Sequence, residues 1–179
     1  MARDEDPLWE ALDRPGDQLA AESARARSHR RWLAQLAAES ATLAGILLSL
    51  AEIEEPVTVR CGPWTHRGLL RRVGSSTCIL EEPEAIVLLV TAAVTRVDSS
   101  RAVVDDRTPP EGPDLGTALA DLATHHPAVR LQLGDGSELA GVLAAVGKDV
   151  AQLRLPPSTA SVRLSAIACA LLPFGRHPV

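Results

Sequence analysis

A seven-residue pattern occurs twice in this chain, and it limits the folds that the chain can adopt. Residues 68–74 read GLLRRVG, and residues 141–147 read GVLAAVG, an offset of 73. A repeat at a fixed spacing predicts two copies of one structural unit.

The residues that flank this pattern also match. Residues 57–61 and 129–133 alternate apolar and polar side chains, and each run ends in a glycine-containing turn. Alternation followed by a turn is typical of a strand that enters a hairpin. Residues 77–80 match residues 150–153, and residues 86–94 match residues 160–168. Each copy is therefore expected to form about five short strands.

The second strand of each copy is expected to bend. Its inward positions would be Gly68, Leu70 and Val73, which are spaced by two and then by three residues. A strict strand has a spacing of two, and a bulge adds one residue. Glycine also allows a close backbone approach at a bend. A long, bent second strand would let a few strands curl into a small barrel.

The order of strand, turn, G-x-L-x-x-V-G and three further strands resembles the small barrel of Sm/LSm-type proteins, which is SH3-like. The resemblance covers about residues 57–97 and 128–172, and the helices predicted before each copy fit it. It implies an α+β protein, mainly β, in which a long N-terminal helix precedes two five-stranded barrels.

The RNA-binding residues of the Sm family do not carry over. Sm proteins typically place an Asp, an aromatic residue and an Asn in the loop after the second strand. Here residues 74–77 read GSST and residues 147–150 read GKDV. The Arg-Gly pair expected between the last two strands is also missing. These loops offer no aromatic ring for stacking a base.

Two helices are expected before the first copy. Asp6 and Pro7 predict the start of a short helix that carries Trp9, and Pro15-Gly16 would end it. Asp17 would then cap a long helix that ends near Glu55, before a proline. Apolar residues and one serine mark a helical face by steps of three and four: Leu33, Leu36, Ser40, Leu43, Leu47 and Leu50.

Arginines form two groups that could bind nucleic acid or an acidic partner. The helix carries Arg25, Arg27, Arg30 and Arg31, and the first copy carries Arg67, Arg71 and Arg72. Arg71 and Arg72 correspond to alanines in the second copy, so the repeat does not require them. The alternative is a solvated, partly balanced surface, which is the usual role of a charge run.

The first copy is more apolar than the second. We assign Ile79, Val87 and Leu89 to the outward face of its third and fourth strands, where the second copy has Gln152, Ser161 and Arg163. A strand that is apolar on both faces is covered on both sides. The cover could be the long helix, the second copy or another subunit. Trp64 in the first hairpin could bind a partner or fold back over the strands.

Composition and motifs favour a binding protein over an enzyme. The net charge of −5 and the pI near 5.5 oppose a dedicated nucleic-acid protein. The common catalytic and nucleotide-binding motifs are missing. Three cysteines without C-x-x-C spacing indicate neither a disulfide framework nor a zinc site. We expect no catalytic residue, cofactor or metal, no membrane segment, and a cytoplasmic location.

The expected organisation has five parts: a helical region over 1–55, the first barrel over 56–97, a mobile linker over 98–113, a short helix with the second barrel over 114–172, and a tail over 173–179. The expected function is that of a non-enzymatic adaptor that binds a protein partner or associates with itself as a homodimer. Nucleic-acid binding through the arginines, for example of RNA, is the alternative.

Overall fold

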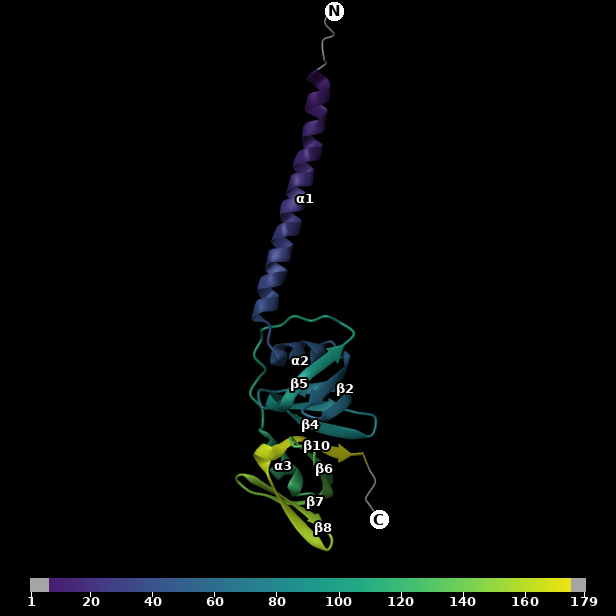
Figure 1. Cartoon of the computed structure of the whole chain (residues 1–179), viewed down its shortest axis with the longest axis vertical. Helices are drawn as coiled ribbons and strands as arrows, with labels where there is room; N and C mark the ends of the chain where they lie inside the picture. Colours follow the sequence, from purple (N-terminus) through teal and green to yellow (C-terminus); the bar gives the residue numbers. More distant parts are fainter. Residues whose placement is uncertain (1–6, 175–179) are drawn as a thin grey trace, which may run out of the picture. The chain divides into compact units, whose positions relative to one another are not determined.

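The structure is a computed structural model that describes residues 7–174, with side chains described from residue 20 onward except for residue 21. Within these residues, three α-helices and ten strands form an α+β protein (Figure 1). The strands pair antiparallel in one sheet that is not closed. The α+β class is therefore confirmed. The chain divides into two compact units, Met1–Ser40 and Ala41–Val179.

The first unit holds the predicted long N-terminal helix, α1, over Pro7–Ser40. The predicted interruption at Pro15-Gly16 was wrong, because the helix continues through both residues. A proline lacks one backbone donor, but its fixed φ is close to the helical value, so the chain can stay helical around it. Every described side chain of α1 is exposed. The expected position of Trp9 lies outside the described side chains.

A break separates α1 from α2, which spans Leu43–Glu52. Thr42 is extended and its hydroxyl accepts a hydrogen bond of 3.0 Å from the Gly45 N–H, which caps α2. The Thr42 N–H donates to the Asp105 carbonyl oxygen at 2.9 Å. A continuous helix to Glu55 was therefore a wrong prediction. The predicted apolar face is also divided, because Leu47 is buried on α2 while Leu33 is exposed on α1.

The second unit consists of two halves with the same order of elements. The first half contains α2 and five strands: β1 (Pro56–Cys61), β2 (Trp64–Val73), β3 (Thr77–Glu81), β4 (Ala85–Val90) and β5 (Val94–Ser99). The second half contains α3 (Leu115–Ala123) and five strands: β6 (Ala128–Leu133), β7 (Glu138–Val146), β8 (Val150–Leu155), β9 (Ser158–Arg163) and β10 (Ile167–Pro173). A short 3₁₀ helix precedes the last strand of each half, over Thr91–Ala93 and Leu164–Ala166.

The two halves join through β4 and β10. The sheet order is β5-β1-β2-β3-β4-β10-β6-β7-β8-β9, so the fifth strand of each half lies beside its first strand. At the junction Leu89 lies opposite Cys169, and Ala85 lies opposite Pro173. Figure 1 shows the yellow β10 against the teal β4. The two end strands, β5 and β9, are more exposed and more polar than the strands that join.

The predicted bend of the second strand occurs in both halves. The pairing of β2 with β3 shifts between Leu70 and Arg72, and that of β7 with β8 shifts between Leu143 and Ala145. At Gly68, an added Cβ would lie 2.0 Å from the Glu81 carbonyl oxygen. At the matching glycine of the second half, Gly141, the corresponding distance to the Arg154 carbonyl oxygen is 2.7 Å. The repeated glycine therefore permits the close approach of the third strand.

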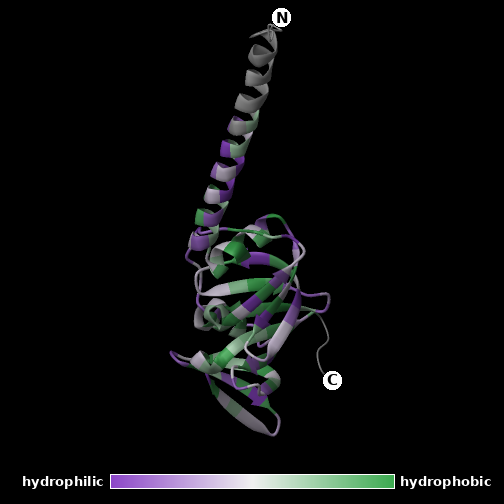
Figure 2. Ribbon diagram, turned by 45° about the horizontal axis from the view of Figure 1, so that its top comes forward, coloured by the Kyte–Doolittle hydropathy of each residue, from purple (hydrophilic) through white to green (hydrophobic). Residues whose placement is uncertain are grey.

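Each half has its own hydrophobic core, and Figure 2 shows hydrophobic residues along the strands of the second unit. Leu47 and Leu50 of α2 enter the first core, whereas Leu115 and Leu119 of α3 enter the second. Leu88 of the first half packs in the second core. The first half is thus covered on its outer side by the second half, one of the three covers that the sequence allowed.

The segment that connects the halves is held in place by hydrogen bonds. The Arg107 guanidinium donates to Asp105 Oδ2 at 2.8 Å and to Glu52 Oε2 at 2.7 Å. The Ser49 hydroxyl donates to the same Asp105 oxygen. The hydrogen bonds that Arg107 and Ser49 donate to Asp105 lower the pKa of its carboxyl group, and those that Arg107 donates to Glu52 and Asp105 raise the pKa of Arg107. These contacts anchor the segment on α2.

Candidate functional site

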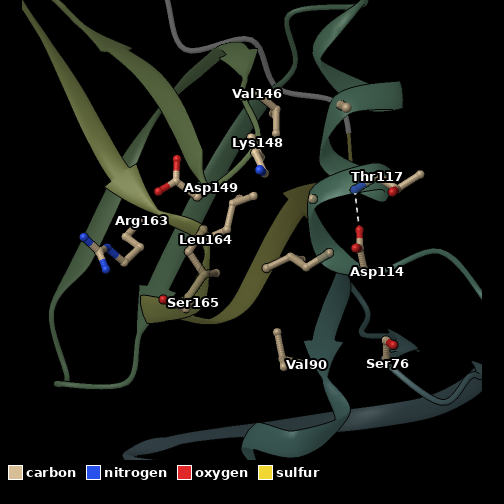
Figure 3. A pocket seen from close by; sticks show the side chains of 15 residues that line it. Ser76, Val90, Asp114, Thr117, Val146, Lys148, Asp149, Arg163, Leu164 and Ser165 are labelled. Atoms are coloured by element: carbon tan, nitrogen blue, oxygen red, sulfur yellow. Dashed lines mark hydrogen bonds between the residues drawn. The ribbon is translucent and has the colours of Figure 1, made fainter.

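A groove of about 680 Å³ opens beside the N-terminus of α3 (Figure 3). The second half supplies α3, the turn between β7 and β8, and the end of β9, while the first half supplies Ser76 and Val90. Its apolar surface comes mainly from Val90, Leu115, Val146, Leu164 and Ile167. A concave apolar surface with a few polar groups at its edge is typical of a binding site.

The N-terminus of α3 forms one wall of the groove. Asp114 caps this helix, because its Oδ1 accepts a hydrogen bond of 2.7 Å from the Thr117 N–H (Figure 3). That bond lowers the pKa of Asp114. Leu115 and Leu119 fix the helix in the second core. The carboxylate is thus occupied by its own helix and is a poor candidate for a general acid or base.

The turn between β7 and β8 forms the opposite wall. It is closed by a hydrogen bond of 2.7 Å from the Gly147 N–H to the Val150 carbonyl oxygen. The Asp149 carbonyl oxygen accepts a bond of 2.9 Å from the Leu164 N–H, which ties the turn to the end of β9. Lys148 stands on this turn and is exposed. In Figure 3, Arg163 extends away from α3, so Lys148 is the cation nearer to the middle of the groove.

A buried polar chain joins the two halves on another side of the unit. His66 is 4% exposed; its Nδ1 lies 3.0 Å from Glu82 Oε1 and its Nε2 lies 2.9 Å from Gln132 Oε1. The Gln132 amide donates to Glu138 Oε2 at 3.0 Å. Both ring nitrogens of His66 therefore have a side-chain partner, one from each half of the unit. No periodic pattern in the sequence predicts this contact between residues 66 positions apart.

Trp64 lies close to this chain rather than at an exposed loop tip. Its indole Nε1 donates a hydrogen bond of 2.8 Å to the Leu133 carbonyl oxygen, and its ring packs against the first core. The sequence left two roles open for Trp64, partner binding or packing back over the strands, and its side chain packs over the strands. Trp64 bridges the two halves.

The outward assignment of Val87 and Leu89 was wrong. Both are 0% exposed and lie in the first core, so they are not available to a partner. The residues of β4 that face the second half are Leu88 and Val90, which pack in or against the second core. Ile79 was assigned correctly to the outward face, where it packs against the second core and is half-buried. The structure therefore leaves none of the three on a free apolar surface.

The arginines of the first half are dispersed. Arg71 is the extra residue at the bulge of β2, and its guanidinium pairs with Glu81 and lies 3.7 Å from Glu54 Oε1. The hydrogen bond to Glu81 raises the pKa of Arg71. Arg67 and Arg72 are exposed. An arginine that two carboxylates neutralise attracts phosphate weakly.

The helix arginines divide between two faces of α1. Arg27, Arg30 and Arg31 are related by three and four residues and therefore share one face. Arg25 is two residues from Arg27 and points to another side, since successive helical residues turn by about 100°. Trp32, Leu33 and Leu36 lie opposite these three arginines, on the side of Arg25, and are 56%, 46% and 44% exposed.

The described residues contain no group of three His, Cys, Asp or Glu side chains that could hold a metal ion. Cys61, Cys78 and Cys169 are free thiols buried in the first core. A hydrogen bond between Cys61 and Cys169 lowers the pKa of the first thiol and raises that of the second, whereas burial raises the pKa of Cys78. Burial without a cationic neighbour is typical of structural cysteines.

Hydropathy identifies no single described helix that could cross a bilayer, and one broken pair passes the same test by length and composition alone, Glu22–Ser40 with Leu43–Glu52. Leu47 and Leu50 of that pair are buried in the first core.

Comparison of the sequence with models of known protein families gives no match. Comparison with curated proteins gives no significant match either.

Proposed function

We propose that this chain is a non-enzymatic interaction protein that associates with a second copy of itself, or with a protein partner, through α1. The apolar face of α1 carries the proposal. Trp32, Leu33 and Leu36 are all more than 40% exposed on a helix whose described side chains have no buried member. Because most helical stability in proteins comes from packing, an apolar helical face of this kind needs a partner.

In this proposal the second unit is a rigid scaffold formed by two Sm-like, SH3-like barrels in tandem. The support is the strand order, which is the same in both halves, together with the matching bulges of β2 and β7. The 3₁₀ turns before β5 and β10 add to it. Fold alone does not define a function, so the interaction role rests on α1.

Sedimentation of the full chain over a range of concentrations tests self-association. We expect a mass above that of one chain, and we expect Leu33→Glu/Leu36→Glu to give one chain at every concentration. Ala34→Glu/Ala38→Glu is the matched control, because it adds the same charge to the opposite face of α1. Glutamate is a good helix former, so neither pair removes the helix itself.

A wild-type chain that sediments as a monomer throughout would reject self-association. A partner would then be sought by co-purification with the wild type, with Leu33→Glu/Leu36→Glu and with the control Ala34→Glu/Ala38→Glu. Retention by the wild type and the control, with loss in Leu33→Glu/Leu36→Glu, would support a partner bound by α1. Equal retention by all three would reject the role of α1.

Nucleic-acid binding is the second candidate, and the shared face of Arg27, Arg30 and Arg31 favours it. Phosphate binding weakens steeply as salt rises. We would titrate labelled single-stranded RNA and duplex DNA at low and at physiological salt. Binding that falls with salt and is lost in Arg27→Ala/Arg31→Ala, but is retained in Arg154→Ala, would support this candidate over the first.

A further inference from the structure

The connecting segment lies across one end of the first half as an extended peptide. The Thr42 N–H donates to the Asp105 carbonyl oxygen at 2.9 Å, and the Ser75 N–H donates to the Pro110 carbonyl oxygen at 3.1 Å. These two donors stand at the N-terminus of α2 and on the turn between β2 and β3. Residues 105–110 therefore bridge the helix and the turn.

The fit of this segment is close. An added Cβ at Gly45 would lie 2.6 Å from the Asp105 carbonyl oxygen, so the backbones approach each other directly. At Gly74 an added Cβ would lie 3.7 Å from the Pro110 carbonyl oxygen, an ordinary contact. Pro109 is buried. The first half thus shows an extended, proline-containing segment in its bound form.

The second half has a similar receiving surface, with Thr117 in the position of Gly45. Asp114 caps α3 as Thr42 caps α2. The turn that holds Lys148 is closed by the bond from Gly147 to Val150, as the turn that holds Ser75 is closed by a bond of 2.9 Å from the Gly74 N–H to the Thr77 carbonyl oxygen. The helix cap and the turn of the second half line the groove of about 680 Å³ described above.

The second half has equivalents of the two backbone N–H groups, of Thr42 and Ser75, that bind the segment in the first half. In the described part of the chain, the backbone N–H groups of Asp114 and Lys148 make no backbone hydrogen bond. Their equivalents, Thr42 and Ser75, both bind the segment. The groove therefore offers two unused donors at the positions that grip the peptide in the first half.

The charge of the groove differs from that of the equivalent surface of the first half, between α2 and the turn from β2 to β3. Lys148, the chain's only lysine, replaces Ser75, and among the described residues it forms no ion pair. Asp114 also lines the groove, but its carboxylate is held by the Thr117 N–H. Asp149 and Arg163, which carry opposite charges, both lie on the side of Leu164 away from α3 (Figure 3). Lys148 is left to pair with a carboxylate of the occupant.

We propose that this groove binds an extended, proline-containing peptide of a partner protein that places an acidic side chain beside Lys148. The peptide lies between α3 and the turn from β7 to β8, as residues 105–110 lie between α2 and the turn from β2 to β3. Its backbone carbonyl oxygens accept from the N–H groups of Asp114 and Lys148, and its apolar side chains contact Leu115 and Leu164. All residues that line the groove belong to the second unit, so the groove adds a second site to the proposed interaction function.

A synthetic peptide with the sequence of residues 102–113, AVVDDRTPPEGP, is a suitable probe. In the full chain the first half is occupied by its own segment, so the labelled peptide can report on the second half. We expect saturable binding of one peptide per chain by fluorescence anisotropy. A peptide in which glycine replaces the prolines should bind at least about tenfold more weakly, because it loses the pre-set extended backbone.

Variants of the groove test its location. Lys148→Glu should weaken binding by about tenfold or more, because it replaces an attraction with a repulsion. Ala120→Trp should abolish binding by filling the groove without a change in charge. Arg154→Glu, on β8 and outside the groove, is the matched control and should bind as the wild type does.

Amide chemical shifts identify which half the peptide occupies. Shifts at Thr117 and Lys148 would support the proposal, whereas shifts at Ser75 and Gly45 would show displacement of the chain's own segment and would overturn it. Absence of saturable binding, or equal binding by Lys148→Glu and Ala120→Trp, would also overturn it. Displacement of the peptide by single-stranded RNA at low salt, with equal binding of the proline-free peptide, would assign the groove to nucleic acid instead.

The variants separate this proposal from the function proposed for α1. Leu33→Glu/Leu36→Glu should leave peptide binding unchanged, and Lys148→Glu should leave sedimentation unchanged. Failure of one result therefore does not imply failure of the other.

Discussion

The indole Nε1 of Trp64 donates a hydrogen bond of 2.8 Å to the carbonyl oxygen of Leu133, which joins the first hairpin of one half to the first strand of the other. Together with the buried contact between His66 and Gln132 and the pairing of β4 with β10, it makes the two halves parts of one cooperative structure.

Trp64→Phe keeps most of the ring and removes the donor. We expect a loss of about 1 kcal/mol in the free energy of unfolding, since a net hydrogen bond contributes roughly 0.5–1.5 kcal/mol. Urea titration measures this change. Trp32→Phe on the exposed face of α1 is the control and should leave the urea midpoint unchanged; an equal shift in both variants would contradict the bridging role.

His66 and Gln132 should be energetically coupled. His66→Leu and Gln132→Leu each leave a buried polar partner unsatisfied, so each should cost about 1–3 kcal/mol. The double variant should cost less than the sum, because neither partner is then left alone. A double-mutant cycle of urea denaturation measures the coupling, and strict additivity would show that the contact contributes nothing.

Gly68→Ala should destabilise the sheet, because the new methyl group would meet the Glu81 carbonyl oxygen at 2.0 Å. Overpacking of a core costs roughly 1–3 kcal/mol, and a backbone obstacle places this change at the upper end. Gly134→Ala is the control, because the added Cβ would lie 3.9 Å from its nearest neighbour, the Ala166 carbonyl oxygen. Thermal unfolding of both variants should separate them clearly.

Leu88→Ala should destabilise both halves together. Leu88 belongs to β4 of the first half but packs in the core of the second, and removal of a buried leucine side chain costs about 2–5 kcal/mol. We expect a single unfolding transition at a lower temperature by calorimetry. Val104→Ala, at a 51% exposed side chain, should unfold as the wild type does. Two separate transitions in the wild type would refute the cooperative unit.

Asp105 should contribute to acid sensitivity. Its pKa is lowered in the folded state by Arg107 and Ser49, so its contribution to stability is present above the pKa of the unfolded chain, near 4, and is lost as pH falls further. Asp105→Asn should lower the urea midpoint at pH 7 and reduce its change between pH 7 and pH 3. Asp106→Asn, at an exposed neighbour, should keep the wild-type profile.

The bend of the second strand could be predicted because it follows from the spacing of one glycine and two core residues that are close in the sequence. The spacing of Gly68, Leu70 and Val73 requires an extra residue, and the structure places a bulge there in both halves. Asp114 likewise predicts the start of α3, because its side-chain oxygen can cap a helix. Signals of this kind depend on neighbours in the sequence.

The orientation of β4 could not be predicted, because residues 85–90 are all apolar and show no alternation. Either face could have pointed inward, and the outward assignment of Val87 and Leu89 was wrong. The break before α2 has a similar origin. Residues 40–42 are tolerated in helices, and the break is fixed in part by the contact between Thr42 and Asp105, which lies far away in the sequence.

The groove was missed for the same reason. The composition of residues 98–113 predicts a loop, but not that the loop seats itself against α2 and the turn that carries Ser75. Lys148 has no neighbours in the sequence that mark it as a binding residue, because the groove beside it is formed by elements far apart in the chain.

The two ends of the sheet are counterparts of the strands that meet in its middle. In the repeat, Cys169 of β10 corresponds to Arg96 of β5, and Leu89 of β4 corresponds to Val162 of β9. A further chain that added to the sheet in the register of the junction would set Arg96 opposite Val162, in the place where Cys169 and Leu89 are fully buried. Because an unpaired guanidinium is costly to bury, growth of the sheet by repetition of its central junction is opposed.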